Sequence, residues 1–267
     1  DCIIHTRNHD FRHLRSVIAV DRLCTAAPDK QSAFDGHIIQ RDFASADGNG
    51  YIVLPPQVLN AGNYGVPESR ERVIFIGIRK DVLRTEALAA LTSESIPDEY
   101  NPYPRPTHAG NTTQPGLLPK VTTYDVLKYL PEPADAVDPS QRIYSKAKFQ
   151  TNGSQGQTEI KLDGLGPTIR SEHHGNIEYR RLSAEHGGKH IAELNNGMHE
   201  RRLTPRECAL IQTFPPDFRF VMHDKDGRKY RLSSSGAYKV IGNAVPPVLA
   251  FNIAIRLQNL WDKYFID

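Results

Sequence analysis

The sequence has 267 residues, of which 39% are hydrophobic and 24% are charged, and these fractions are close to those of ordinary globular domains. The length suits one large domain or two modest ones, and the composition excludes a disordered tail, a collagen and a coiled coil. Lys and Arg number 33 and Asp and Glu number 31, so the net charge of +2 neither supports nor excludes a nucleic-acid partner.

The first 50 residues show little regular pattern. We expect one short strand or helix near 12–20. Three histidines spaced by four, at positions 5, 9 and 13, could share a helix face as metal ligands. No acid or cysteine completes such a site, so a solvated basic face is the favoured interpretation and no metal is predicted.

Two short apolar runs follow, Tyr51–Leu54 and Val73–Ile78, and both are rich in β-branched residues. They predict two neighbouring strands joined by a turn-rich segment. The second run is continuously apolar, which is typical of a strand buried on both faces in an α/β sheet.

Nine prolines break the segment 81–163 into short pieces, with helices expected only near 82–92 and 123–130. Irregular segments of this size often have a recognition function. The last third is more regular. Thr204, Pro205 and Glu207 predict a capped helix from Pro205 to about Thr213. A second helix is expected after Pro246-Pro247, with leucine or isoleucine at 249, 253, 257 and 260 on one face.

Three stretches, in chain order, resemble conserved blocks of the DNA (cytosine-5)-methyltransferase family. Residues 60–77 resemble the eighth block, written Y-G-[VI]-P-Q-x-R-x-R followed by a strand. Residues 202–209, with Gln212, Phe214 and Pro215, resemble the ninth block, and 241–247 resemble the tenth. Three blocks in family order indicate membership of this family.

The resemblance implies an α/β fold, the C-terminal portion of a Rossmann-like S-adenosylmethionine-dependent methyltransferase domain with an inserted irregular target-recognition domain. The chain would leave the catalytic domain (1–81 and 201–267) for the recognition domain (82–200) and return. The implied reaction is methyl transfer from S-adenosylmethionine to C5 of a flipped cytosine in double-stranded DNA. It places the protein with bacterial, DNA-associated restriction-modification methyltransferases of the cytoplasm.

Arg70 and Arg72 alternate at the entrance of the second predicted strand, so their side chains could share a face and hold two acceptors at once. The alternative is a pair of ordinary surface arginines. The resemblance implies catalytic-site roles: Arg70 would contact the DNA backbone, and Arg72 would bond the flipped cytosine near O2. Family members usually have glutamine where this chain has Glu68, and a carboxylate would repel a phosphate.

The tenth block lies beside the cofactor in this family, so the resemblance implies that Asn243 and Ala244 form part of the S-adenosylmethionine pocket. A helix N-terminus also favours an anionic carboxylate. A simple turn and helix cap is the alternative.

The stretch 166–176 resembles the part of the recognition region where a threonine and an aliphatic residue approach the target base. A solvated loop is the alternative. Basic and amide side chains suit contacts to base edges and phosphates. The predicted DNA-binding residues are Thr168, Ile169, Arg170, His173, His174 and Asn176, with Arg180 and Arg181 as further candidates.

The family's chemistry also needs a Pro-Cys nucleophile, a Glu-Asn-Val segment and a glycine-rich cofactor loop, and none of these occurs in this sequence. The three cysteines lack a CxxC pair and a preceding proline, and Cys208 is expected to be a buried structural thiol. No signal-like segment and no run near ~18 apolar residues occurs, so no secretion and no membrane partner are expected.

Three interpretations of the chain fit these absences. The chain is a fragment of a longer methyltransferase, or a split-enzyme subunit that needs an N-terminal catalytic half, or a DNA-binding module without catalysis.

Overall fold

The computed structural model describes residues 2–3, 16–21, 50–112, 114–151, 155–171, 176–223, 229–231 and 233–265. The chain divides into two compact units. Unit 1 is Asp1–Leu59, Glu71–Arg105 and Ala250–Asp267, and unit 2 is Asn60–Arg70 and Pro106–Leu249. The histidines at 5, 9 and 13 lie outside the described residues.

Unit 1 is built on a five-stranded sheet: β1 (Cys2–Ile3), β2 (Ser16–Asp21), β3 (Tyr51–Val53), β4 (Gln57–Asn60) and β5 (Glu71–Arg79). β5 pairs with β2, β3 and β4, and its pairings with β2 and β3 are antiparallel. β3 and β5 confirm the two neighbouring strands predicted from the apolar runs. β2 shows that the segment near 12–20 is a strand.

The burial of β5 alternates at its start, because a strand points successive side chains to opposite faces. Ile74, Ile76 and Ile78 are fully buried, whereas Val73 and Phe75 are only half-buried. The expected burial on both faces therefore holds only for the end of the strand, from Ile76 to Ile78.

Short helices complete unit 1: η4 (Lys80–Val82), α2 (Thr85–Leu91), η5 (Asp98–Tyr100), most of α8 (Pro247–Asn259) and α9 (Trp261–Tyr264). α2 confirms the helix predicted near 82–92 and buries Ala87 and Leu91. α8 confirms the last long helix, whose predicted apolar face buries Leu249 and Ile253. Ala250–Asp267 lies in the same compact unit as the sheet.

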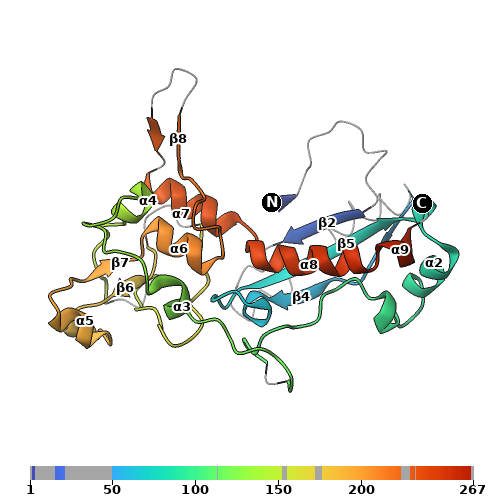
Figure 1. Cartoon of the computed structure of the whole chain (residues 1–267), viewed down its shortest axis with the longest axis horizontal. Helices are drawn as coiled ribbons and strands as arrows, with labels where there is room; N and C mark the ends of the chain where they lie inside the picture. Colours follow the sequence, from blue (N-terminus) through green and yellow to red (C-terminus); the bar gives the residue numbers. More distant parts are fainter. Residues whose placement is uncertain are drawn as a thin grey trace. The chain divides into compact units, whose positions relative to one another are not determined.

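Among the residues that the structure describes between 123 and 243, unit 2 contains ten short helices and strands. They are α3 (Thr123–Leu127), α4 (Pro139–Arg142), β6 (Tyr179–Arg181), η6 (Ala184–His186), α5 (Ile191–Asn195), β7 (Arg201–Arg202), α6 (Pro205–Ile211), β8 (Val221–His223), β9 (Lys229–Arg231) and α7 (Ser234–Asn243). It also contains η3 (Ala61–Tyr64). α6 and α7 pack against each other around a shared apolar core (Figure 1).

The predicted helix beginnings in unit 2 are confirmed. Thr122 and Thr204 each form a capping box, with Asp125 and Glu207 respectively. Such a cap satisfies backbone N–H groups that the first helical turn leaves free. Leu203 and Cys208, on either side of this cap, are both fully buried in the core.

The structure corrects the interpretation of Gly242 and Asn243. They are the last two residues of α7, which the sequence analysis did not predict, and not a turn before the final helix. α7 begins with a Ser233 cap and buries Tyr238 and Ile241. Ala244 ends it with an extended backbone, and α8 begins at Pro247.

The compact units differ from the predicted domains. The segments 60–70 and 201–249 lie in unit 2 together with most of the predicted recognition region, whereas 82–105 lies in unit 1. The stretch Ser234–Asn259 is long and apolar enough to cross a membrane by length and composition alone. α7 and α8 are two separate helices there, divided by Ala244, Val245 and Pro246, and the stretch buries Tyr238, Ile241, Leu249 and Ile253.

Candidate recognition and cofactor site

The first part of the eighth block forms a tight turn in unit 2. Asn60 caps η3 by accepting a hydrogen bond from the Gly62 N–H, and Gly65 ends it in a left-handed conformation with φ of 86°. Glycine adopts this conformation without the steric cost of a Cβ atom. The turn delivers Pro67, Glu68 and Ser69 to the recognition stretch.

The block then runs beside the recognition stretch. Glu68 and Gly166 form a parallel bridge, in which the Gly166 N–H donates to Pro67 O at 2.9 Å and the Ser69 N–H donates to Gly166 O at 2.8 Å. The Thr168 hydroxyl donates to Ser69 O at 2.7 Å. Residues about 100 positions apart in the chain are thus fixed side by side.

The side chain of Arg70 is not that of an ordinary surface arginine, which was the alternative interpretation. It is fully buried, and Nη1 donates to Ile169 O at 2.7 Å. Nη2 donates to Gly242 O at 2.7 Å and to Ala244 O at 3.0 Å. The guanidinium is thus enclosed by protein acceptors, and the contact with the DNA backbone that the resemblance implies stays a prediction.

Glu68 explains part of this arrangement. Its buried carboxylate accepts the Ile169 N–H at 2.5 Å and lies 3.3 Å from Arg70 Nη1. A buried carboxylate is stable only when it is paired and hydrogen-bonded. The acid that departs from the family pattern therefore faces Arg70 and the recognition stretch, not a phosphate.

Arg72 lies in unit 1, whereas Arg70 lies in unit 2. Arg72 is the second residue of β5 and is 7% exposed. Its Nη1 donates to Glu71 O at 2.5 Å. Its role at the target cytosine stays a prediction.

The predicted recognition residues have different environments. Ile169 is fully buried in the core of unit 2, so its side chain is not presented to a base. Arg170 is about one third exposed and pairs with Glu178 at 2.9 Å, and Asn176 is half-buried. His173 and His174 lie outside the described residues.

At the predicted cofactor wall, the Asn243 side chain is exposed and Ala244 is half-buried. Ala244 O accepts Arg70 Nη2 and also Gln212 Nε2, the latter at 2.8 Å. Gln212 is fully buried and also donates to Ile241 O at 2.7 Å. It belongs to the ninth block, yet no local sequence signal indicates that it holds the end of α7.

Gly242 lies at the predicted cofactor wall, where its backbone approaches the recognition stretch closely. A Cβ atom at Gly242 would overlap backbone atoms of Arg170 and Ser171. Only glycine permits so close an approach of two backbones. The end of α7 and residues 168–171 are therefore in direct backbone contact within unit 2.

An open groove of about 1290 Å³ lies in unit 2 beside the same stretch. Ser69, Gly166 and Pro167 line it on one side. Three exposed lysines also line it: Lys120, Lys161 and Lys189. Two acids, Glu159 and Asp163, line the groove as well, so the lysines outnumber the acids by one. Positive charge along a groove suits the phosphates of a nucleic acid. Among the residues that the structure describes, no cluster of three His, Cys, Asp or Glu could hold a metal ion.

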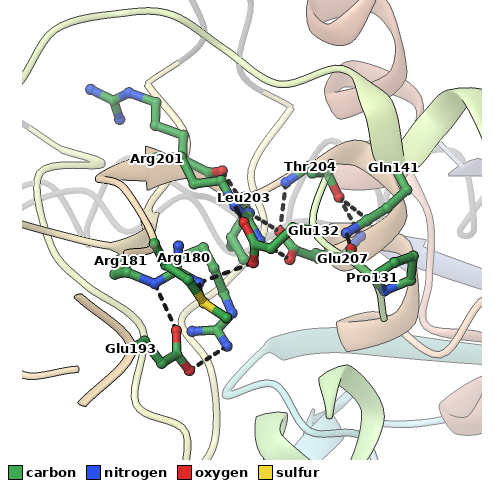
Figure 2. A network of polar contacts seen from close by, with 12 residues as sticks. Pro131, Glu132, Gln141, Arg180, Arg181, Glu193, Arg201, Leu203, Thr204 and Glu207 are labelled. Carbon is green, nitrogen blue, oxygen red and sulfur yellow. Dashed lines mark hydrogen bonds and ion pairs between the residues drawn. The ribbon is translucent and has the colours of Figure 1, made fainter. Parts of the chain in front are cut away.

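Arg180 and Arg181, the further candidates, belong to a polar network that joins β6, β7, α5 and α6 (Figure 2). Glu193 accepts from Arg180 at 2.8 Å and from Arg181 at 2.7 Å. Arg181 also donates to Glu132 at 3.0 Å, and its side chain is fully buried. The side chains of both arginines therefore bind acids of unit 2 and stabilise its structure.

The other half of the network centres on Arg201. Its Nη1 and Nη2 donate to the two oxygens of Glu207 at 2.9 Å each, and Nε and Nη2 donate to Glu132 at 3.0 Å. Burial alone would raise the pKa of the Glu132 carboxyl, but bonds and charge from Arg201 and Arg181 outweigh it and lower the pKa to about 2. Glu132 is therefore held ionised.

Cys208 is fully buried in α6, and burial raises the pKa of its thiol well above the usual value. A nucleophilic cysteine needs access and a lowered pKa. Cys208 is therefore a structural thiol, as expected.

Comparisons with known proteins agree with this assembly of blocks. The family model described as C-5 cytosine-specific DNA methylase matches residues 31–259. The Type II methyltransferase M.BsuRI of Bacillus subtilis is 32% identical and covers 86% of this chain and 46% of its own length. M.BspRI of Lysinibacillus sphaericus is 31% identical, with 86% and 48% covered.

A solved structure, the S. pombe Dnmt2 methyltransferase, aligns with a TM-score of 0.55 at 15% identity, over 92% of this chain and 67% of that one. This likeness supports the α/β methyltransferase fold. The chain belongs to the C-5 cytosine-specific DNA methylase family. It spans about half the length of the curated relatives that it matches.

Proposed function

We propose that this chain is the part of a DNA cytosine-5 methyltransferase that recognises the target sequence and completes the cofactor pocket. The whole enzyme would methylate C5 of a flipped cytosine in double-stranded DNA. The observation that supports it best is the convergence of the three blocks in unit 2. The ninth block holds the end of α7 through Gln212, and the eighth block holds both α7 and the recognition stretch through Arg70. The segments proposed to bind DNA and S-adenosylmethionine would thus be held by the same hydrogen-bonded residues. The enzyme would be a bacterial, DNA-associated modification enzyme of the cytoplasm.

The residues have separate roles in this proposal. Arg72 would bond the flipped cytosine and stabilise charge that develops on the ring. Asn243, with its exposed amide, and Ala244 would form one wall of the pocket for S-adenosylmethionine, which supplies the methyl group when bound. The lysine-lined groove would follow the DNA backbone, and Thr168, Arg170, His173, His174 and Asn176 would lie near the bases. We retain 82–200 as the proposed recognition domain.

The covalent step requires a residue from outside this chain. A cysteine thiolate attacks C6 of cytosine, C5 then takes the methyl group, and loss of the C5 proton releases the thiolate. No cysteine here follows a proline, and Cys208 is buried. An N-terminal catalytic half, in the same polypeptide or as a separate subunit, would supply the nucleophile.

A DNA-binding module without catalysis is the second candidate. The sequence lacks the nucleophile's context, and the lysine-lined groove needs no cofactor in order to bind DNA. Both candidates predict DNA binding, so only a test for methyl transfer separates them.

We expect methyl transfer when the chain is combined with its N-terminal half. The assay uses S-adenosylmethionine labelled in the methyl group and a plasmid pool of diverse sequence, followed by bisulfite sequencing. The expected result is label at C5 of cytosine in one short sequence context. DNA binding without any label, in a complex whose two halves are shown to associate, would support the binding module instead.

The groove makes a prediction for this chain alone. The triple variant Lys120→Gln, Lys161→Gln and Lys189→Gln should bind a duplex more weakly and with a smaller salt dependence. Each lost phosphate contact lowers the slope of log K against log salt by about 0.9. Fluorescence anisotropy at several salt concentrations measures it. Lys239→Gln, an exposed lysine of α7 outside the groove lining, is the control. An unchanged slope in the triple variant would place the DNA elsewhere.

A further inference from the structure

One buried guanidinium joins three distant segments of unit 2. We name Glu68, Arg70, Ile169, Gly242 and Ala244 the Arg70 cluster. Arg70 donates to one carbonyl of the recognition stretch and to two carbonyls at the end of α7. These acceptors are 99, 172 and 174 positions away from it in the chain. A planar guanidinium holds several acceptors in a fixed geometry that a lysine ammonium cannot reproduce.

Glu68 extends the cluster on the recognition side. The same carboxylate oxygen accepts the Ile169 N–H and lies against Arg70, so both backbone polar groups of Ile169 are bound to this pair. Ile169 directly follows Thr168, which is itself bonded to Ser69 O. The backbone position of the proposed base-contacting residues is therefore set by Glu68 and Arg70.

An independent observation shows the same coupling. The backbones at Gly242 and at Arg170 and Ser171 are so close that no Cβ atom fits between them. Close-packed elements transmit a displacement because they do not deform continuously. A shift of residues 168–171 would therefore displace Gly242, and with it Asn243 and Ala244.

We infer that the Arg70 cluster couples target recognition to the cofactor pocket, with Glu68 and Arg70 as positioning residues. This inference rests on the proposed function, because the two coupled segments are those assigned there to DNA and to S-adenosylmethionine. Coupling between two sites is reciprocal. DNA bound at 168–171 would change the affinity for S-adenosylmethionine, and the cofactor would change the affinity for DNA by the same factor.

The first test uses this chain alone and needs no methylation. Hydrogen exchange is measured at the amides of Ile169 and Ala244 in wild type and in Arg70→Lys. We expect exchange to accelerate about tenfold or more at both amides, because the variant loses buried hydrogen bonds to both segments. Acceleration at one amide only, or at neither, would overturn the inference.

Arg202→Lys is the matched control for this test. Arg202 is equally buried in unit 2 and also donates to backbone carbonyls, those of Ala147 and Gly156, at 2.9 and 2.6 Å. Its hydrogen-bond acceptors in the described part of the chain lie outside 168–171 and 241–244. We expect Arg202→Lys to lower overall stability without accelerating hydrogen exchange at the Ile169 and Ala244 amides together. Equal acceleration of exchange in both variants would show that Arg70 stabilises the fold in general and does not couple the two segments.

The second test uses the complete methyltransferase. The affinity for S-adenosylmethionine is measured with and without cognate duplex, and the ratio of the two affinities is the coupling factor. Couplings of this kind are typically about 5–150-fold. We expect the factor to fall toward one in Arg70→Lys and Glu68→Ala. Glu68→Gln, whose amide oxygen can still accept the Ile169 N–H, should restore most of it.

The two tests separate the inference from the proposed function. Absence of methylation by the wild-type complex contradicts the proposed function, and the hydrogen-exchange test still decides whether the cluster couples the two segments. An active wild type whose coupling factor is unchanged in Arg70→Lys would overturn the inference while the proposed function stands.

Discussion

Arg72→Ala in the complete methyltransferase is expected to lower kcat by about 10²–10³-fold, the usual cost of removing one donor that stabilises developing charge. Its affinity for DNA should change little, because the bond to the flipped cytosine is only one of many contacts with the duplex. Single-turnover methylation with labelled S-adenosylmethionine and equilibrium binding to the same duplex measure the two quantities separately.

Arg79→Ala is the matched control, because Arg79 is the last residue of the same strand and pairs on the surface with Asp81. Its kcat should stay close to that of the wild type. A small loss of kcat in Arg72→Ala, or a loss explained entirely by weaker DNA binding, would contradict the assignment.

Arg70 and Arg72 look equivalent in the sequence but have different environments in the structure. Arg70 is bonded to acceptors from three segments of unit 2, whereas Arg72 lies at the start of β5 in unit 1. Alternation along a strand predicts which side chains share a face. It does not predict what covers that face, because the three carbonyl acceptors of Arg70 belong to residues 99, 172 and 174 positions away.

Local rules succeeded where the determining residues are neighbours in the chain. Thr204 and Glu207 cap α6 through bonds that span three residues, so the beginning of α6 could be predicted. The apolar run at β5 likewise predicted a strand there. In both cases the physical cause lies within a few residues.

α7 was missed because its own sequence is a weak helix signal. Its first three residues are Ser234, Ser235 and Gly236, and it ends in Gly242 and Asn243, none of which favours a helix interior. Tertiary contacts stabilise it: the Tyr238 hydroxyl donates to Leu203 O at 2.6 Å, and Gln212 binds Ile241 O. Packing of a helix face outweighs intrinsic propensity in such cases.

Glu207→Ala should destabilise unit 2 by about 3–5 kcal/mol, the usual cost of breaking a buried ion pair by removing one partner. Glu207 is 2% exposed and binds both Nη atoms of Arg201. Its carboxylate also accepts a hydrogen bond from the Thr204 N–H at 2.8 Å. Urea denaturation followed by circular dichroism measures the loss. Glu185→Ala, an exposed acid of unit 2, should change stability by less than about 0.5 kcal/mol. Equal stability of the two variants would show that Arg201 is satisfied without Glu207.

The pH dependence of stability tests the same network from its other acid. The pKa of Glu132 falls from its ordinary 4.5 to about 2 in the folded chain, where it accepts from Arg201 and Arg181. A lowered pKa means that its stabilising contribution is complete above about pH 4.5 and is lost as the pH falls toward 2. Glu132→Gln should therefore be less stable than wild type at pH 7 and should lose less stability between pH 5 and pH 2. Parallel pH profiles for the two proteins would show that Glu132 does not stabilise the fold through its charge.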